Sequence, residues 1–237
     1  MFAWREDLGP ARLRITDRRG GVSAPPYDGL NLALHVGDDV AAVHANRELL
    51  AGALGVASEW LVFMDQCHGG DVAVVDGPPG QPLQVDAMVT RRPGLALVVL
   101  VADCTPVLAV DADAGVVGVA HAGRAGLVAQ VVPAMIEAMQ RLGAGAIKAR
   151  VGPSICELCY PVPRALQEQT AAAVPTACAT SRSGEPALDI AGGVVSQLVA
   201  CGVGVTPVSG CNAEDPTYFS YRRDRVTGRY AGVALLA

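Results

Sequence analysis

With 237 residues, of which 51% are hydrophobic, the chain is long enough to bury a large core. Its formal net charge of −5, without a run of Lys or Arg, argues against nucleic acid as a partner and favours a small molecule. No apolar run approaches the roughly 20 residues that span a bilayer, so no membrane association is expected. Residues 1–7 are charged and lack a signal core, and seven cysteines accompany no export signal. We therefore expect a cytoplasmic protein with reduced thiols.

The first predicted elements are a strand at residues 12–16 and a helix at residues 38–54. The helix is indicated by apolar side chains that recur near the 3.6-residue period. Asp38 or Asp39 is suited to cap its start, and Gly55 is a typical stop.

Short apolar, β-branched segments then follow in close succession, separated by Asp-Gly, Pro-Gly and Asp-Ala turns. Their connections are too short for helical crossovers, so several neighbouring strands must be antiparallel. We expect them to form one central sheet. The predicted strands are residues 61–64, 72–75, 87–90, 95–101, 107–110 and 116–120.

The remaining chain contains the most regular predicted helix, at residues 127–142, where apolar side chains recur at three- and four-residue steps. Residues 180–186 are polar and predict a surface loop too short to separate domains. Antiparallel strands with later helices indicate an α+β fold. The other expected elements are strands at 146–151, 205–208 and 233–236 and helices at 164–174 and 190–201.

Three potential metal ligands follow predicted strands: His68, Cys104 and His121. A tight turn at residues 111–115 joins the strands that carry the last two, so a hairpin can bring them together. Two imidazoles and one thiolate leave a fourth tetrahedral position for water, as in catalytic zinc sites. A hydrogen-bonded turn histidine and a buried structural cysteine are the simpler interpretations. Asp103 favours the metal site, because a buried carboxylate without a partner is costly.

Motifs occur in an ordered series along almost the whole chain. They include Gly20-Gly21-Val22-Ser23, Gln66-Cys67-His68-Gly69, Ala102-Asp103-Cys104-Thr105-Pro106, Ala120-His121-Ala122-Gly123, Gly152-Pro153-Ser154-Ile155 and Phe219-Ser220-Tyr221-Arg222-Arg223-Asp224. This series resembles the multicopper polyphenol oxidase/laccase-domain family, whose members are also described as zinc-dependent purine nucleoside phosphorylases and as peptidoglycan editing factors. The resemblance implies one domain, residues 1–237, with a layered α/β/β/α arrangement. It also implies a Zn²⁺ site formed by His68, Cys104 and His121.

Two departures from the family pattern lie beside the proposed ligands. Arg124-Ala125 stands where the family usually has Trp-Arg, which replaces an aromatic wall with a basic one. Cys67 replaces a Val and places a second thiol next to His68. We expect Cys67 to point away from the metal, because neighbours on an extended segment face opposite sides.

A bound metal suggests a mechanism for nucleoside chemistry. Zinc lowers the pKa of its water from about 15.7 towards 7, which suits attack at C6 of adenosine. Asp103 is the nearest candidate for moving a proton in this reaction. His68, Cys104, His121 and Asp103 are therefore the predicted catalytic set.

Phosphorolysis at the ribose C1′ requires a phosphate site as well. Arg47, Arg222 and Arg223 are candidates, because the arginine fork matches phosphate oxygens. Asn31 and Asn46 are candidates for binding the ribose hydroxyls. The predicted small-molecule partners are thus a nucleoside and phosphate.

Cys156 and Cys159 have the spacing of half a zinc ribbon or of a redox pair. No second Cys-x-x-Cys accompanies them, and Gly152-Pro153 precedes them instead of a thioredoxin-like strand. We interpret these cysteines as packing or pocket-lining residues and expect one zinc per chain.

Three functions remain open at this point. The resemblance implies a zinc-dependent enzyme that phosphorolyses adenosine, inosine and methylthioadenosine and deaminates adenosine. A second possibility is an amidohydrolase that edits cell-wall precursors, with Cys104 as the nucleophile activated by His121. The third is a non-catalytic module that binds a nucleotide or a partner. Four histidines are too few for the usual copper centres, so zinc is favoured over copper.

Overall fold

A computed structural model describes the whole chain, residues 1–237, and contains two stacked sheets. The five-stranded sheet has the order β1 (Phe2–Leu8), β2 (Ala11–Thr16), β13 (Tyr230–Leu236), β6 (Ala96–Val101) and β3 (Leu61–Phe63). The six-stranded sheet has the order β12 (Gly204–Pro207), β9 (Lys148–Val151), β7 (Thr105–Asp111), β8 (Val116–Ala122), β5 (Ala87–Thr90) and β4 (Val72–Val74). Both sheets are mixed, and most neighbouring strands are antiparallel.

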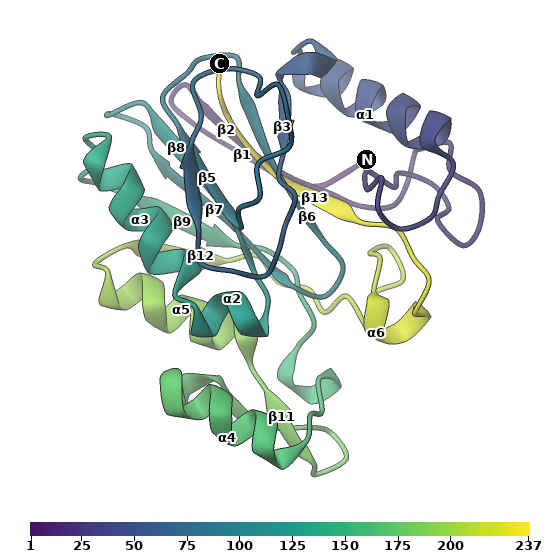
Figure 1. Cartoon of the computed structure of the whole chain (residues 1–237), viewed down its shortest axis with the longest axis vertical. Helices are drawn as coiled ribbons and strands as arrows, with labels where there is room; N and C mark the ends of the chain where they lie inside the picture. The colour runs from purple at the N-terminus through teal and green to yellow at the C-terminus, as the bar shows by residue number, and fades with distance from the viewer.

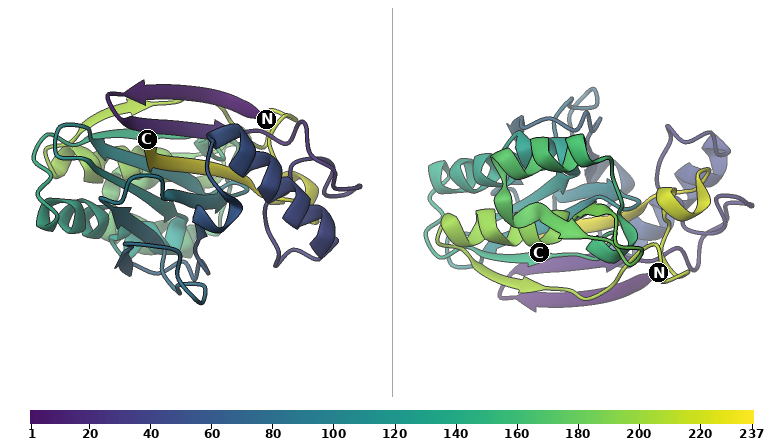
Figure 2. Two further views of the ribbon diagram at one scale, coloured as in Figure 1. Left: turned by 90° about the horizontal axis from the view of Figure 1, so that it is seen from above. Right: turned by 90° about the horizontal axis from the view of Figure 1, so that it is seen from below.

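Helices cover the outer face of each sheet, which gives the layered α/β/β/α arrangement (Figures 1 and 2). α1 (Val40–Leu54) packs on the five-stranded sheet. The six-stranded sheet is covered mainly by α2 (Arg124–Val128), α3 (Val131–Arg141) and α5 (Ile190–Ala200). The predicted α+β class and layering are confirmed. No helix combines the length and apolar character needed to cross a membrane.

The remaining elements are short. α4 (Arg164–Ala173) lies with the hairpin of β10 (Cys178–Thr180) and β11 (Pro186–Leu188) at one end of the long axis (Figure 1). The predicted loop at residues 180–186 connects these two strands. α6 (Tyr221–Asp224) precedes β13, and three 3₁₀ turns complete the fold: η1 (Ser58–Trp60), η2 (Glu157–Cys159) and η3 (Pro175–Ala177).

The alternation of side chains explains why the central strands are apolar on both faces. In β6, Leu97 and Val99 point into the core between the sheets, whereas Val98 and Leu100 face α1. Strands β7 and β8 likewise divide their side chains between the inter-sheet core and the α3 side. A strand buried on both faces therefore needs no polar residue until it ends.

The expectation of one central sheet was wrong. Strands β3 and β6 belong to the five-stranded sheet, and β4, β5, β7 and β8 belong to the six-stranded one. The error has a physical reason, because an apolar run identifies a buried strand without indicating its partner. The unpredicted β1 is a half-exposed edge strand whose charged residues hide the apolar alternation.

The predicted helix at 127–142 is divided in two. α2 ends at Val128, and Gln130, with a φ of 62°, starts a new axis for α3. By contrast, the predicted helix at 38–54 is confirmed as α1, with the Asp39 side chain accepting from the Ala41 N–H.

Candidate metal centre and its pocket

The three predicted metal ligands meet at one end of the two sheets. His68 lies in the loop between β3 and β4, Cys104 directly precedes β7, and His121 is near the end of β8. β7 and β8 pair antiparallel with Pro106 opposite His121, which places Cys104 and His121 side by side. The ligand atoms of all three residues lie within 4.8 Å of one another. The Cys104 Sγ is 3.9 Å from the His68 Nε2.

A buried carboxylate that the sequence analysis did not select holds two of these ligands. Asp86 accepts hydrogen bonds from the backbone N–H groups of Cys67, His68 and Gly69, at 3.1, 3.0 and 2.6 Å. It also accepts from the His121 Nδ1 at 2.8 Å. Because a carboxylate only accepts, the His121 proton resides on Nδ1, which leaves Nε2 free to bind a metal.

The charges in this cluster depend on one another. Burial raises the pKa of the Cys104 thiol, but the positive charge of His121 and hydrogen bonds from both histidines outweigh it, and the pKa is about 6. Burial lowers the pKa of His121, but the Cys104 thiolate and Asp86 raise it to about 9. Burial also raises the pKa of Asp86, yet hydrogen bonds from His121, Gly69 and Cys67 hold it well below its ordinary value. At neutral pH Cys104 and Asp86 are thus negative and His121 is positive, so the cluster keeps a net negative charge that attracts a cation. A bound metal would take the place of the second His121 proton, the one on Nε2.

The backbone around the cluster is constrained. His68 and Asp103 have φ values of 61° and 93°, a region that non-glycine residues rarely occupy and that is common at functional sites. Gly123 follows β8 in the same cluster, where an added Cβ would lie 3.0 Å from both the Cys104 Sγ and the His68 Cδ2. A side chain at position 123 would therefore crowd Cys104 and His68.

These observations test whether a metal fits. Two imidazoles and one thiolate are a common donor set for catalytic zinc, and metal-bound histidines usually donate their other N–H to a carboxylate or carbonyl oxygen. His121 and Asp86 have that relationship, and Gly123 keeps the centre open. The residues present therefore fit a bound metal ion.

A cavity of about 620 Å³ opens beside the three ligands, which is within the range of small-molecule sites. Its apolar and aromatic walls include Leu100, Val101, Ile155, Tyr160 and Ile190. Burial raises the pKa of Tyr160, so its phenol is neutral. The cavity thus offers an apolar surface large enough for an aromatic base.

Four arginines line the same cavity, and they give it a basic wall. The Arg222 guanidinium donates to the Pro161 carbonyl at 3.0 Å and lies 4.8 Å from the centre of the Tyr160 ring. No protein acceptor is bonded to the side chains of the two arginines at positions 124 and 225 within the structure. An anion therefore has several free N–H donors beside the metal centre. The four arginines are Arg124, Arg222, Arg225 and Arg229.

Asp103 lines the cavity, but both of its carboxylate oxygens are bonded to the region around α6. Oδ1 accepts from the Ser220 hydroxyl at 2.7 Å, and Oδ2 accepts from the Arg222 backbone N–H at 2.6 Å. This geometry favours a positioning role, in which Asp103 holds the Arg222 backbone while the Arg222 side chain lines the cavity. Its role in proton transfer stays a prediction.

The structure does not bring the two predicted ribose-binding asparagines to the cavity. Asn46 is fully buried, and its amide bonds to Val22, Ser23, Gly29 and Asn31. The Asn31 side chain in turn bonds to Ala33, Asp38 and the Arg229 N–H. Both amides hold the loop before α1 and align the backbone at Arg229.

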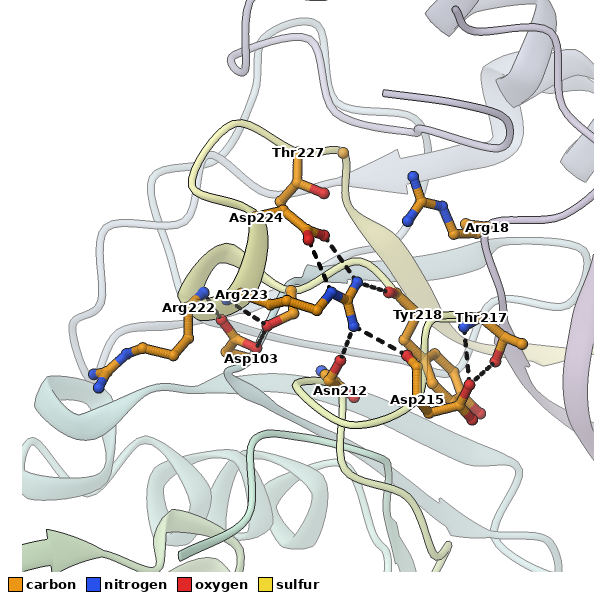
Figure 3. A network of polar contacts seen from close by, with 12 residues as sticks. Arg18, Asp103, Asn212, Asp215, Thr217, Tyr218, Arg222, Arg223, Asp224 and Thr227 are labelled. Atoms are coloured by element: carbon orange, nitrogen blue, oxygen red, sulfur yellow. Dashed lines mark hydrogen bonds and ion pairs between the residues drawn. The ribbon is translucent and has the colours of Figure 1, made fainter. Parts of the chain in front are cut away.

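Two of the three predicted phosphate-binding arginines are also used within the fold. Arg47 donates two hydrogen bonds to the Leu32 carbonyl and lies 3.7 Å from the centre of the Phe63 ring. Burial lowers its pKa to about 10. Arg223 points away from Arg222 and donates to Asn212, Asp215, Tyr218 and Asp224 (Figure 3). Only Arg222 of the three lines the cavity.

The cysteines divide into distinct environments. The Cys67 thiol contacts Asp86 at 3.1 Å and does not belong to the three-ligand group. Cys156 and Cys159 converge with Cys211 and Glu214, which lie far away in the sequence. The sequence offered no signal for this convergence, because Cys211 has no partner at metal-binding spacing. Asp86 is a single acid before a strand, and Arg225 and Arg229 lie in the charged segment at 222–229, so none of the three had a spacing that pointed to the site.

Comparisons with known proteins address the identity of the chain. A family model described as multi-copper polyphenol oxidoreductase laccase matches residues 12–237. The chain belongs to this family. The curated relatives include a purine nucleoside phosphorylase of Streptomyces griseus, 54% identical over 234 residues that cover 96% of this chain and 95% of the relative. Another, from Streptomyces coelicolor, is 52% identical over 243 residues and covers 100% of both chains.

Solved structures of similar proteins agree with the fold. The hypothetical protein YfiH of Bacillus licheniformis has a TM-score of 0.89 and 30% identity, covering 96% of this chain and 93% of the other. YlmD of Geobacillus stearothermophilus has a TM-score of 0.88 and 30% identity, covering 99% and 98%. The layered arrangement is therefore shared by this laccase-like family.

Asp86→Asn should weaken metal binding without changing the fold. The substitution keeps the size of the side chain but removes the charge that orients His121, and loss of such a partner typically costs about 10–100-fold in metal affinity. Zinc affinity measured by competition with a chelator tests this, with the exposed Asp76→Asn as the matched control. Wild-type affinity in Asp86→Asn would show that the carboxylate does not support the site.

Arg223→Ala should lower stability, because it leaves three backbone carbonyls without their charged donor. Hydrogen bonds to charged groups contribute about 1.5–3 kcal/mol, so a loss of about 2 kcal/mol is expected. For a chain of this size, that corresponds to a fall in Tm of about 4–8 °C. Thermal unfolding followed by circular dichroism measures it, with the exposed Arg91→Ala as control. An unchanged Tm together with weaker phosphate binding would instead support the sequence-based assignment of Arg223 to phosphate.

Proposed function

We propose that the protein is a zinc-dependent purine nucleoside phosphorylase that also deaminates adenosine. The observation that carries this proposal is the position of His68, Cys104 and His121 beside a cavity with a basic wall and an apolar wall. A nucleoside and phosphate together need such a combination, since one part is apolar and aromatic and the other is anionic. The names of the curated relatives support the same substrate class.

Zinc is the metal that suits this donor set best. Thiolate and imidazole ligands are both common for zinc, whereas copper oxidases need many more imidazoles than the two found here. When bound, zinc supplies a positive charge that polarises oxygen and lowers the pKa of coordinated water. We assign His68, Cys104 and His121 as its ligands, with Asp86 orienting His121.

The arginine wall is assigned to phosphate. Arg222 and its neighbours would hold the anion by N–H donors on its oxygens while one oxygen faces the ribose C1′. In phosphorolysis, a phosphate oxygen bonds to C1′ as the C1′–N9 bond breaks, and the electron pair leaves with the purine. The purine nitrogen takes up the proton that the monohydrogen phosphate loses, so the products are the free base and ribose 1-phosphate. The guanidinium groups position the nucleophile. The negative Asp103 carboxylate lines the same cavity and stabilises the positive charge that develops on the sugar.

The purine is assigned to the wall that contains Tyr160. Its neutral ring and the side chains of Ile155 and Ile190 exclude water from one face of the base. For deamination the co-reactant is water instead of phosphate. Its oxygen bonds to C6 of adenosine, the C6–N6 bond breaks, and ammonia leaves to give inosine. One cavity therefore accommodates both reactions with different nucleophiles.

The cavity also bears on the domain organisation. Its lining extends in sequence from His35 to Arg229 and takes side chains from loops next to both sheets. The two sheets also share one hydrophobic core, which favours a chain that folds as one unit. We infer that residues 1–237 form a single catalytic domain.

A second candidate function is supported by one specific observation. Cys104, His121 and Asp86 form the chain of contacts found in cysteine hydrolases, and the pKa of the Cys104 thiol is lowered to about 6. Without metal, this arrangement suits an amidohydrolase with Cys104 as nucleophile. The two candidates differ in their response to zinc, because a bound metal occupies the thiolate.

The assay that tests the proposal supplies the purified protein with adenosine or inosine in the presence and absence of phosphate. Zinc-loaded protein should release the base and ribose 1-phosphate only when phosphate is present, and removal of zinc by a chelator should abolish turnover. Cys104→Ser should fail in the same way, because a hydroxyl does not replace the thiolate ligand. Nucleoside turnover that survives zinc removal would contradict the metal-dependent mechanism. Hydrolysis of a cell-wall amide by metal-free protein would support the second candidate.

Arg222→Ala should impair phosphorolysis more than deamination. One charge-assisted contact contributes about 1.5–3 kcal/mol, which corresponds to about a 10–100-fold increase in KM for phosphate. Deamination does not use the anion and should change by less than about threefold, or ~0.7 kcal/mol. Initial rates at varied phosphate measure the difference, with Arg91→Ala as the control. Equal loss of both activities would indicate a role in nucleoside binding or folding.

A further inference from the structure

A second group of potential metal ligands includes the sequence neighbours of two residues that line the cavity. It consists of Cys156, Cys159, Cys211 and Glu214, whose ligand atoms all lie within 4.8 Å of one another. None of the four lines the cavity, and none belongs to the first cluster. The three cysteines are half-buried and Glu214 is exposed, so an ion can reach them from solvent. This group is not used by the proposed function.

The fold brings the four residues together by joining two distant segments. A parallel bridge links Ser154 with Cys211, and the Asn212 N–H donates to the Ser154 carbonyl at 3.1 Å. The Cys156 backbone N–H donates to the Cys211 Sγ at 3.3 Å, and the Cys159 Sγ lies 3.5 Å from the Glu214 Oε1. Backbone hydrogen bonds thus fix the segments, and the sulfur atoms face one another across the junction.

We propose that Cys156, Cys159, Cys211 and Glu214 bind a second metal ion, a structural zinc held by three thiolates and one carboxylate. Tetrahedral zinc has Zn–S distances of about 2.3 Å, which places its sulfur ligands about 3.8 Å apart. Ligand atoms already within 4.8 Å reach that spacing by small side-chain rotations. Four protein ligands close the coordination sphere, which distinguishes a structural site from a catalytic one.

The surrounding charge supports this assignment. Three thiolates and one carboxylate exceed the charge of a divalent ion by two, and Arg182 forms an ion pair with Glu214 that reduces this excess. The Arg182 backbone N–H donates to the Leu158 carbonyl at 3.1 Å, so the backbone of Arg182 is held at the same turn as Cys159. A disulfide is a weaker explanation, because it would use two sulfur atoms and leave the third thiol and the carboxylate without a role.

The site has a consequence for the cavity. The turn that carries Cys156 and Cys159 also carries Ile155 and Tyr160, which line the cavity. The next residue, Pro161, accepts the hydrogen bond from Arg222. A metal at the junction would fix this wall relative to the catalytic cluster. The inference replaces the sequence-based interpretation of Cys156 and Cys159 as packing residues and the expectation of one zinc per chain.

Metal analysis of the full chain after loading with zinc under reducing conditions tests the proposal. Wild-type protein should retain two zinc ions per chain. A triple variant that combines Cys156→Ser, Cys159→Ser and Cys211→Ser should retain one. Cys178→Ser changes an exposed cysteine outside both groups and should retain the wild-type number. A wild-type chain that retains one zinc, or a triple variant that retains as much as wild type, would overturn the second site.

A measurement on the unmutated protein tests the second site even if the triple variant misfolds. Alkylation of zinc-loaded and chelator-treated protein, read by peptide mass spectrometry, should show that zinc protects Cys156, Cys159 and Cys211 but leaves Cys178 reactive. Equal alkylation with and without zinc, or a disulfide among the three after reduction, would overturn the proposal. The outcome is separable from the proposed function, because phosphorolysis by a protein with one zinc would refute only the second site. Two bound zinc ions without nucleoside turnover would refute only the function.

Discussion

The buried Asp86 carboxylate is the constraint on which the rest of the metal centre depends. It accepts from three consecutive backbone N–H groups and from the His121 ring. A buried carboxylate without these partners would cost several kcal/mol, so the loop at residues 67–69 and His121 must converge on it. The loop follows β3 of the five-stranded sheet, and His121 is on β8 of the six-stranded sheet. One side chain thus fixes two of the proposed metal ligands and ties the ends of both sheets.

The layered fold determines where the polar residues of the site lie. The central strands are buried on both faces, so polar residues are concentrated where the strands end. The strain at His68 and Asp103, both with positive φ, is tolerated because hydrogen bonds and packing hold the ends of these strands. Asp103, next to Cys104 in the sequence, links this cluster to the arginine wall, since its carboxylate accepts from Ser220 and from the backbone of Arg222. The metal cluster and the basic wall are therefore parts of one network.

The sequence predicted local features well and long-range features poorly. α1 and the hairpin of β7 and β8 were predictable because caps, turns and periodicity are local signals, and the hairpin was enough to place Cys104 beside His121. The division into two sheets was not predictable, because an apolar strand carries no record of its neighbour. Asp86 was missed because a single acid before a strand has no distinctive spacing.

The arginines also show that the sequence does not reveal which contacts a side chain makes. Arg222 and Arg223 are neighbours with the same chemistry, yet one lines the cavity and the other bonds to backbone carbonyls (Figure 3). Their opposite roles follow from the short helix α6, which directs consecutive side chains to different faces. Cys211 could not be joined to Cys156 and Cys159 without the bridge between their segments.

The central claim is that His68, Cys104 and His121 hold a zinc ion at the cavity. Anomalous diffraction from a zinc-loaded crystal, recorded above and below the zinc absorption edge, tests it most directly. The account predicts an anomalous peak about 2.0–2.1 Å from a ring nitrogen of each histidine and about 2.3 Å from the Cys104 Sγ. A fully ordered cluster without a peak, in crystals that bind zinc elsewhere, would contradict it.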